Sequence, residues 1–186
     1  LFNDFARQPL LPKLFSQLGP GVAWVDLDND GGDELVLGTG RGGLLEVFRN
    51  TSPRGFVKVR SGQQPPTPDD LGGLAAWAAS DGRPSVLTSL ANYESGMTNL
   101  PAVFQCSLQG QPAGMSIHSL EGISPERWSP GPLAVADIDG DGDLDLFVGG
   151  RVVPGAYPVA ASSKIYRQEK GKLELDTQNT GVLRDA

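Results

Sequence analysis

The chain has 186 residues, which is enough for one domain with a sizeable core and too few to expect two. Its 22 acidic and 15 basic residues give a formal charge of −7, which disfavours nucleic acid as a partner, because phosphate binding needs clustered Lys and Arg. With Cys106 as the only cysteine, an internal disulfide and a cysteine-based metal cluster are excluded, and no apolar run reaches the roughly 18 residues of a membrane span.

Short apolar or alternating stretches separated by Gly- and Pro-rich turns predict β-strands along most of the chain. Before them, the leucine-rich stretch 10–18 hints at one or two helical turns. The expected strands form three groups of four: 22–25, 35–37, 44–48 and 56–59; 75–78, 86–90, 103–108 and 115–120; 133–136, 146–148, 163–166 and 173–175.

The three groups are copies of one repeat. The segment GVAWVDLDNDGGDELVLGTG, from Gly21, matches GPLAVADIDGDGDLDLFVGG, from Gly131, with Asp26 and Asp137 as equivalent positions at an offset of 111 residues. A degenerate middle copy, GLAAWAASDGRPSVLTSLAN, places Trp77 opposite Trp24 at an offset of 53 and keeps an Asp81-Gly82 turn without the acidic cluster. A period of roughly 55 residues is in the range of repeat architectures such as β-propellers.

The predicted fold is therefore all-β: a β-propeller segment of about three four-stranded antiparallel blades, forming one domain. The blades are expected at 1–60, with a calcium loop, at 61–123, degenerate and without one, and at 124–186, with a calcium loop. Three blades do not close a ring of the usual four to eight. We therefore expect a segment of a longer propeller, with ring closure by other copies of the chain as the alternative.

The acidity is concentrated in two nine-residue windows, 26–34 and 137–145. These windows hold 10 of the 22 acidic residues and leave 12 acidic against 15 basic residues elsewhere. The second window, DIDGDGDLD, has carboxylates at positions 1, 3, 5 and 9 and Gly142 at position 6, where the backbone must turn. Carboxylates at alternate positions of a tight loop, with the position-7 carbonyl, suit the six to eight oxygen ligands of Ca²⁺.

Other interpretations of the acidic windows fit less well. An EF-hand needs Glu at position 12, where this chain has Leu37 and Val148 inside strands. Magnesium is disfavoured because it resists giving up its waters to an all-protein cage. An acidic turn that binds nothing is opposed by the mutual repulsion of five carboxylates in nine residues.

The motif D-x-D-x-D-G-x-x-[DE]-L, followed by a strand ending in Gly, resembles the FG-GAP/VCBS calcium repeats of integrin-α-type β-propellers. The stretch GGRVVPGAYP, with SSKIYRQEKGKLE after it, is similar to bacterial ASPIC/UnbV-like VCBS proteins. The resemblance implies a seven-bladed propeller with two Ca²⁺ sites and no metal in the middle copy. The implied ligands are Asp26, Asp28, Asp30, Gly32 and Glu34 in the first site, and Asp137, Asp139, Asp141, Asp143 and Asp145 in the second.

For isolated residues that could take part in chemistry or binding, structural roles are mostly expected. The segment GTGRGG, from Gly38, matches a dinucleotide-binding fingerprint, but the residues after it form a strand, so a hairpin turn is expected. His118, the only histidine, is expected to face solvent from a strand. Arg41 and Arg151 follow equivalent strand ends and either brace a neighbouring blade or contact a ligand.

The tryptophans and Tyr157 divide into two groups. Trp24 and Trp77 share a repeat position and are expected to pack between blades. Trp128 and Tyr157 lie in loop-like sequence and are the better candidates for surface contacts.

The expected function is a calcium-stabilised β-propeller module for extracellular protein or glycan binding and cell adhesion, and not an enzyme. The alternatives are a non-catalytic part of a carbohydrate-active enzyme or lectin, and a purely structural scaffold. The expected location is extracellular, periplasmic or at the cell surface, because extracellular calcium modules work at the ion levels found there. The expected partners are calcium, a protein or carbohydrate that the sequence does not identify, and further propeller blades.

Overall fold

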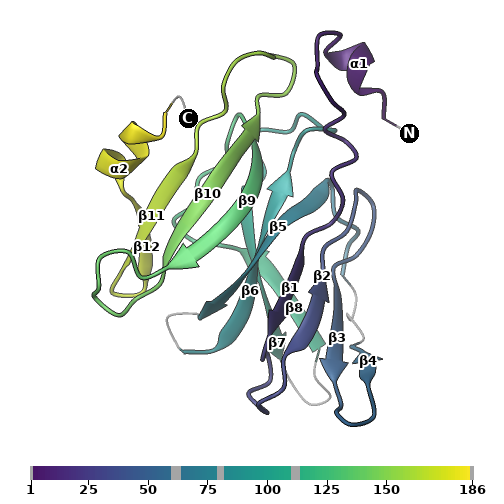
Figure 1. The fold of residues 1–186 in the computed structure, drawn as a ribbon, viewed down its shortest axis with the longest axis vertical. Coiled ribbons are helices and arrows are strands. Elements are labelled where there is room, and N and C mark those ends of the chain that lie inside the picture. Colours follow the sequence, from purple (N-terminus) through teal and green to yellow (C-terminus); the bar gives the residue numbers. More distant parts are fainter. Residues whose placement is uncertain (1, 60–63, 79–81, 110–113, 185–186) are drawn as a thin grey trace.

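A computed structural model describes residues 2–59, 64–78, 82–109 and 114–184. The chain forms three four-stranded antiparallel sheets, each with its strands in sequence order (Figure 1). The first sheet holds β1 (Val22–Val25), β2 (Glu34–Leu37), β3 (Glu46–Asn50) and β4 (Phe56–Lys58). The second holds β5 (Asp70–Ala78), β6 (Pro84–Ala91), β7 (Val103–Gln109) and β8 (Gly114–Ser119). The third holds β9 (Ser129–Ala136), β10 (Asp145–Val152), β11 (Lys164–Glu169) and β12 (Lys172–Leu175).

The prediction of an all-β chain with three groups of four strands is confirmed. The largest differences lie at the ends of β5, β9 and β10, which run several residues beyond the expected strands. The pairing of β5 with β6 shifts register between Leu71 and Leu74, and that of β10 with β9 shifts around Gly150. Glycines that the sequence suggests as strand ends thus lie inside longer strands, where the pairing shifts register.

The second sheet lies between the other two and packs against both (Figure 1). Its face toward the first sheet carries Val86, Leu90 and Cys106, which pack with Val36 and Val47. Its opposite face carries Trp77, Leu87 and Val103, which pack with residues of the third sheet that include Leu146 and Tyr166. Two separate cores therefore hold the three sheets together.

Glycines in or next to the strands permit the close approach of neighbouring sheets. A Cβ at Gly38 would lie 2.5 Å from the Leu71 carbonyl oxygen, and one at Gly73 would lie 2.5 Å from the Gly131 carbonyl oxygen. Buried Ser89 joins the second and third sheets, because its hydroxyl accepts from Gly73 N at 2.8 Å and donates to the Gly131 carbonyl at 2.7 Å. Larger side chains at these glycines would push the sheets apart.

The prediction that Trp24 and Trp77 share a repeat position is wrong, because the repeat alignment is one residue out of register in the middle copy. Trp77 is only 4% exposed and packs toward the third sheet, whereas Trp24 is 54% exposed. Its neighbours Ala23 and Val25 pack toward the second sheet, so Trp24 points to the other face, where it contacts Phe56. Strand pairing makes Ala76 the equivalent of Trp24, because Ala76 pairs with Val86, and Trp24 with Leu35, on corresponding faces. A one-residue slip exchanges the faces of a strand.

Trp128 also differs from its prediction, because it is buried in the core between the second and third sheets. The segment before β9 folds over this core, and its tryptophan fills space that a loop residue would leave empty. Tyr157 is exposed, as expected for a surface residue.

Two short helices lie outside the sheets. The helical turns expected at 10–18 are absent. The helix near the start is instead α1 (Asp4–Arg7), where the Asn3 side chain accepts a capping hydrogen bond from Ala6 N at 3.0 Å. Helix α2 (Thr177–Val182) follows β12, with Asp176 as its N-cap. These are the two helices among the described residues, and neither is long and apolar enough to cross a membrane.

Candidate metal centres

Each acidic window forms the loop between the first two strands of its sheet. We call residues 26–34, between β1 and β2, the first acidic loop, and residues 137–145, between β9 and β10, the second acidic loop. The expected turn is present, with φ of +89° at Gly31 and +94° at Gly142. Two positions earlier, Asn29 and Gly140 are also left-handed, with φ of 58° and 78°. The two loops therefore share their backbone course as well as their composition.

The carboxylate at position 9 fastens each loop to its sheet. Glu34 and Asp145 are 0% and 2% exposed, although both are acidic. Glu34 accepts from Leu27 N at 2.8 Å and from Asn50 N, at the end of β3, at 3.3 Å. Asp145 accepts from Ile138 N at 2.9 Å and from Gln168 N, on β11, at 3.0 Å. Each carboxylate thus joins the start of its loop to the third strand of its sheet.

Burial raises the pKa of Glu34, an effect that the two backbone hydrogen bonds oppose. The nearby negative charges of Asp28 and Asp30 add to the rise. A buried carboxylate in an acidic surrounding is an unfavourable charge unless a cation joins it.

The aspartate at position 1 holds its own loop in a closed turn. Asp26 accepts from Asp30 N at 3.1 Å and from Gly31 N at 2.9 Å. Asp137 accepts from Gly140 N at 2.7 Å and from Gly142 N at 3.1 Å. These bonds fold the loop back so that later carboxylates come close to the first one.

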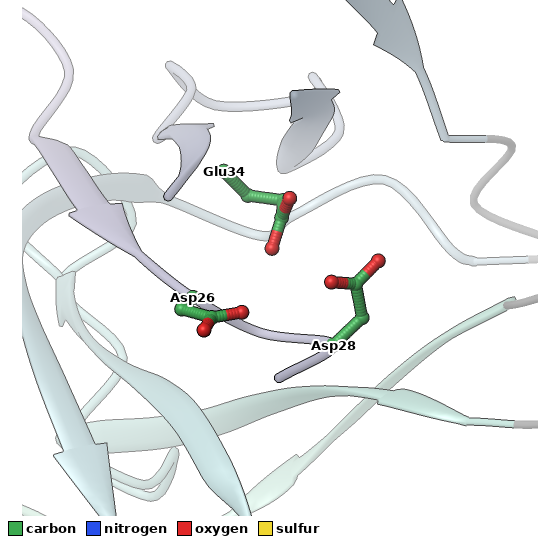
Figure 2. Close-up of side chains that lie close together, drawn as sticks. All are labelled: Asp26, Asp28 and Glu34. Carbon is green, nitrogen blue, oxygen red and sulfur yellow. The ribbon is translucent and has the colours of Figure 1, made fainter. Parts of the chain in front are cut away.

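The loops bring together carboxylates from positions 1, 3 and 9. Asp26, Asp28 and Glu34 each offer an oxygen within 4.8 Å of the others, and Figure 2 shows their carboxylates facing a common space. Asp137, Asp139 and Asp145 form the equivalent trio in the second acidic loop. Oδ1 of Asp28 is buried and has no hydrogen-bond partner among the described residues. Hard oxygen donors with an unpartnered buried atom fit a hard divalent cation such as Ca²⁺.

The other residues predicted as ligands lie less centrally. Asp30 is outside the trios and accepts from Gly32 N at 2.9 Å. Asp141 belongs to a third trio with Asp139 and Glu169, which sequence analysis missed because Glu169 lies 24 residues after the loop, at the end of β11. Asp143 is in none of the trios. In the middle copy, Asp81 lies outside the described residues.

Two arginines that sequence analysis also missed pair with position 3 of the loops. Nε of Arg49, on β3, lies 2.8 Å from Asp28 Oδ2. Arg167, on β11, pairs with Asp139 and also with Asp176, 2.8 Å away. Each arginine directly precedes the residue whose N–H binds the position-9 carboxylate. A repeat alignment extended to the third strand would reveal this correspondence.

Arg41 and Arg151 both lie against the neighbouring sheet. Arg41 N donates to Asp70 at 2.8 Å, and its guanidinium lies 3.8 Å from Glu94. The Arg151 guanidinium lies over Gly72, 3.4 Å from where a Cβ would be, and its burial lowers its pKa. The interpretation of these arginines as braces between sheets is thus supported.

The remaining isolated candidates lie as expected. His118 is exposed on β8. The segment 38–43 leads from β2 into β3 and not into a helix, so its glycines do not form a dinucleotide site. In comparisons with known proteins, no family model matches the chain, and a search of curated proteins finds no match.

Proposed function

We propose that the chain is a segment of a calcium-stabilised β-propeller that serves as an extracellular binding or adhesion module. The observation that carries this proposal is the recurrence of the same carboxylate trio in two loops with 111 residues between equivalent positions. A single acidic turn is common on protein surfaces. Two loops with the same backbone turns, a buried carboxylate at position 9 and an arginine paired with position 3 indicate one repeated structural motif.

Calcium is the ion that we propose for both loops. Each trio offers only oxygen atoms, and the ligand set expected from the sequence adds further carboxylates and a backbone carbonyl. Calcium accepts this number of oxygens in irregular geometry, whereas Mg²⁺ requires a near-ideal octahedron and retains waters. When bound, Ca²⁺ would neutralise the repelling carboxylates and hold the loop against its sheet.

The arrangement of the sheets supports the propeller proposal. The first strands of successive sheets are neighbours, because β1 contacts β5 and β5 contacts β9, as inner strands do around a propeller axis. The outer sheets each have an uncovered apolar face. Val22, Trp24 and Phe56 are exposed on the first sheet. Ala134 and Ala136 are exposed on the third, next to exposed Ile138 of the second acidic loop. We propose that further sheets of the same kind cover these faces.

We propose a passive, non-catalytic role, in which calcium fixes the loops at one end of the sheets. The glycan-binding alternative had rested on Trp128 and Tyr157 as exposed aromatic platforms. Trp128 is buried in a core and is not such a platform, so Tyr157 is the exposed one of these two residues. A scaffold without a partner remains the other alternative.

Titration calorimetry with Ca²⁺ tests the metal proposal. We expect two equivalents for the unchanged chain, one for Asp139→Ala, and two for Asp81→Ala in the degenerate copy. EGTA should lower the melting temperature, because a ligand at 100 times its Kd stabilises a protein by about 2.7 kcal/mol. An unchanged melting curve, or equal stoichiometry in the two variants, would overturn the proposal.

A further inference from the structure

A pocket of about 340 Å³ lies between the second sheet and the proline-rich segment 64–68, and no residue of either acidic loop lines it. Its walls come from β5, β6, β7 and β8, and the proline-rich segment before β5 lies across it. The apolar residues that line it are Leu71, Leu90, Phe104, Met115 and Ile117, together with Pro65, Pro66 and Pro68. A volume of this size falls within the range of small-molecule sites in proteins, roughly 300–1,000 Å³.

Two polar atoms in the wall of this pocket have no partner. Thr88, on β6, is 1% exposed, and its Oγ1 forms no hydrogen bond with the part of the chain that the structure describes. The same is true of Nε2 of Gln64, at the proline-rich edge. An unpaired buried polar group costs about 1–3 kcal/mol, so these atoms call for a partner in the space that they line.

The lining also limits the charge of that partner. The described residues around the pocket include no Asp, Glu, Lys, Arg or His. A charged ligand would lose its hydration without gaining a counter-charge. The unpartnered amide nitrogen of Gln64 donates, and the Thr88 hydroxyl both donates and accepts, so the complementary ligand atom is an oxygen that accepts hydrogen bonds.

We infer that this pocket binds an uncharged, mainly apolar small molecule with a single carbonyl or ether oxygen. The apolar walls hold the body of the ligand, and Thr88 and Gln64 supply hydrogen bonds to its oxygen. Most specific small-molecule sites combine an apolar lining with a few placed polar groups in this way. This site is independent of calcium, because no carboxylate of either acidic loop lines it.

Butyrophenone, an aromatic ketone, is a suitable probe, with methyl NMR of the calcium-loaded protein as the measurement. We expect the ketone to shift the methyl signals of Leu71, Leu90 and Ile117 in a saturable way. Butylbenzene, which lacks the oxygen, should bind about fivefold more weakly, and 4-phenylbutyrate, which is charged, should not bind. No saturable shift with the ketone would overturn the inference and would indicate a pocket filled by water.

Two pairs of measurements localise the site. Met115→Trp fills the pocket and should abolish ketone binding, while Met97→Trp, the same change at an exposed methionine outside the pocket, should leave it intact. Thr88→Val removes the hydroxyl at nearly constant volume. It should weaken ketone binding about fivefold, the worth of one neutral hydrogen bond, and leave butylbenzene binding unchanged. Equal effects of Met115→Trp and Met97→Trp, or of Thr88→Val on both probes, would overturn the inference.

Discussion

Arg49 forms an ion pair with Asp28, with 2.8 Å between Nε and Oδ2, at the place where the first acidic loop would hold its cation. A positive side chain at this position repels Ca²⁺ and competes for one carboxylate oxygen. We therefore predict that Arg49→Gln raises the calcium affinity of the first loop severalfold, roughly 2- to 10-fold, because the pair is partly solvent-exposed and screened. Calorimetric titration of the Asp139→Ala background isolates this loop.

Lys58→Gln is the matched control for Arg49→Gln. It removes one positive charge from an ion pair with Glu46 on the same sheet, outside the acidic loop. If both variants change the affinity equally, the effect is one of net charge and the specific role of Arg49 is contradicted.

The buried position-9 carboxylate should matter even without metal. Asp145→Asn replaces one acceptor oxygen by an NH₂ group, which then faces Ile138 N–H or Gln168 N–H. We predict a loss of about 1–3 kcal/mol in the free energy of unfolding, measured by urea titration in EGTA. Asp143→Asn, in the same loop, should change it by less than about 0.5 kcal/mol, because Asp143 accepts no hydrogen bond from the described residues. Equal losses in the two variants would show that the Asp145 carboxylate has no structural role.

The tryptophans provide a test of which sheet faces are covered. Trp128→Ala should cost about 3–5 kcal/mol of stability, because it empties the core between the second and third sheets. Trp24→Ala should cost less than about 1 kcal/mol in this chain and should reduce self-association through the uncovered face of the first sheet. Urea unfolding and sedimentation at several concentrations measure the two effects. A large loss at Trp24 would mean that this face is covered.

Much of the fold could be predicted from the sequence because its strands are short and bounded by turn residues. The copies of the repeat placed all four strands of each sheet. The face of each strand could not be derived in the degenerate middle copy. No acidic cluster anchors the alignment there, and a shift of one residue decides whether Trp77 or Ala76 is the equivalent of Trp24. The position-9 carboxylate has a sequence signal within its loop. Its partners on β3 and β11 are contacts between strands, which only a repeat alignment extended to Arg49 and Arg167 would indicate. The pocket depends on how the proline-rich segment 64–68 packs on the second sheet, which no local pattern encodes.

The lowered pKa of Asp4 makes the free energy of unfolding depend on pH. Burial acts to raise its pKa, but hydrogen bonds from the Ser16 hydroxyl and from the backbone N–H groups of Phe15 and Ser16 outweigh this and lower it. A lowered pKa in the folded state means that the stabilisation is complete above the unfolded value, about 3.9, and is lost as pH falls through the folded value. Asp4→Asn should therefore show a shallower fall in stability between about pH 5 and pH 2 than the unchanged chain. Parallel curves would contradict this role.

The N-terminal segment also has contacts that reach almost the whole length of the chain. The side-chain Oε1 of Gln8 accepts from Tyr157 N at 2.7 Å across 149 residues, and Leu11 packs with Tyr93 and Val152. Contacts so distant in sequence form late, because a long loop must close before they stabilise anything. During synthesis, Gln8 and Leu11 would leave the ribosome before Tyr93, Val152 and Tyr157, and they could dock only after those partners had been made. A nascent chain that has completed only its first two sheets would leave this segment accessible to proteases and chaperones.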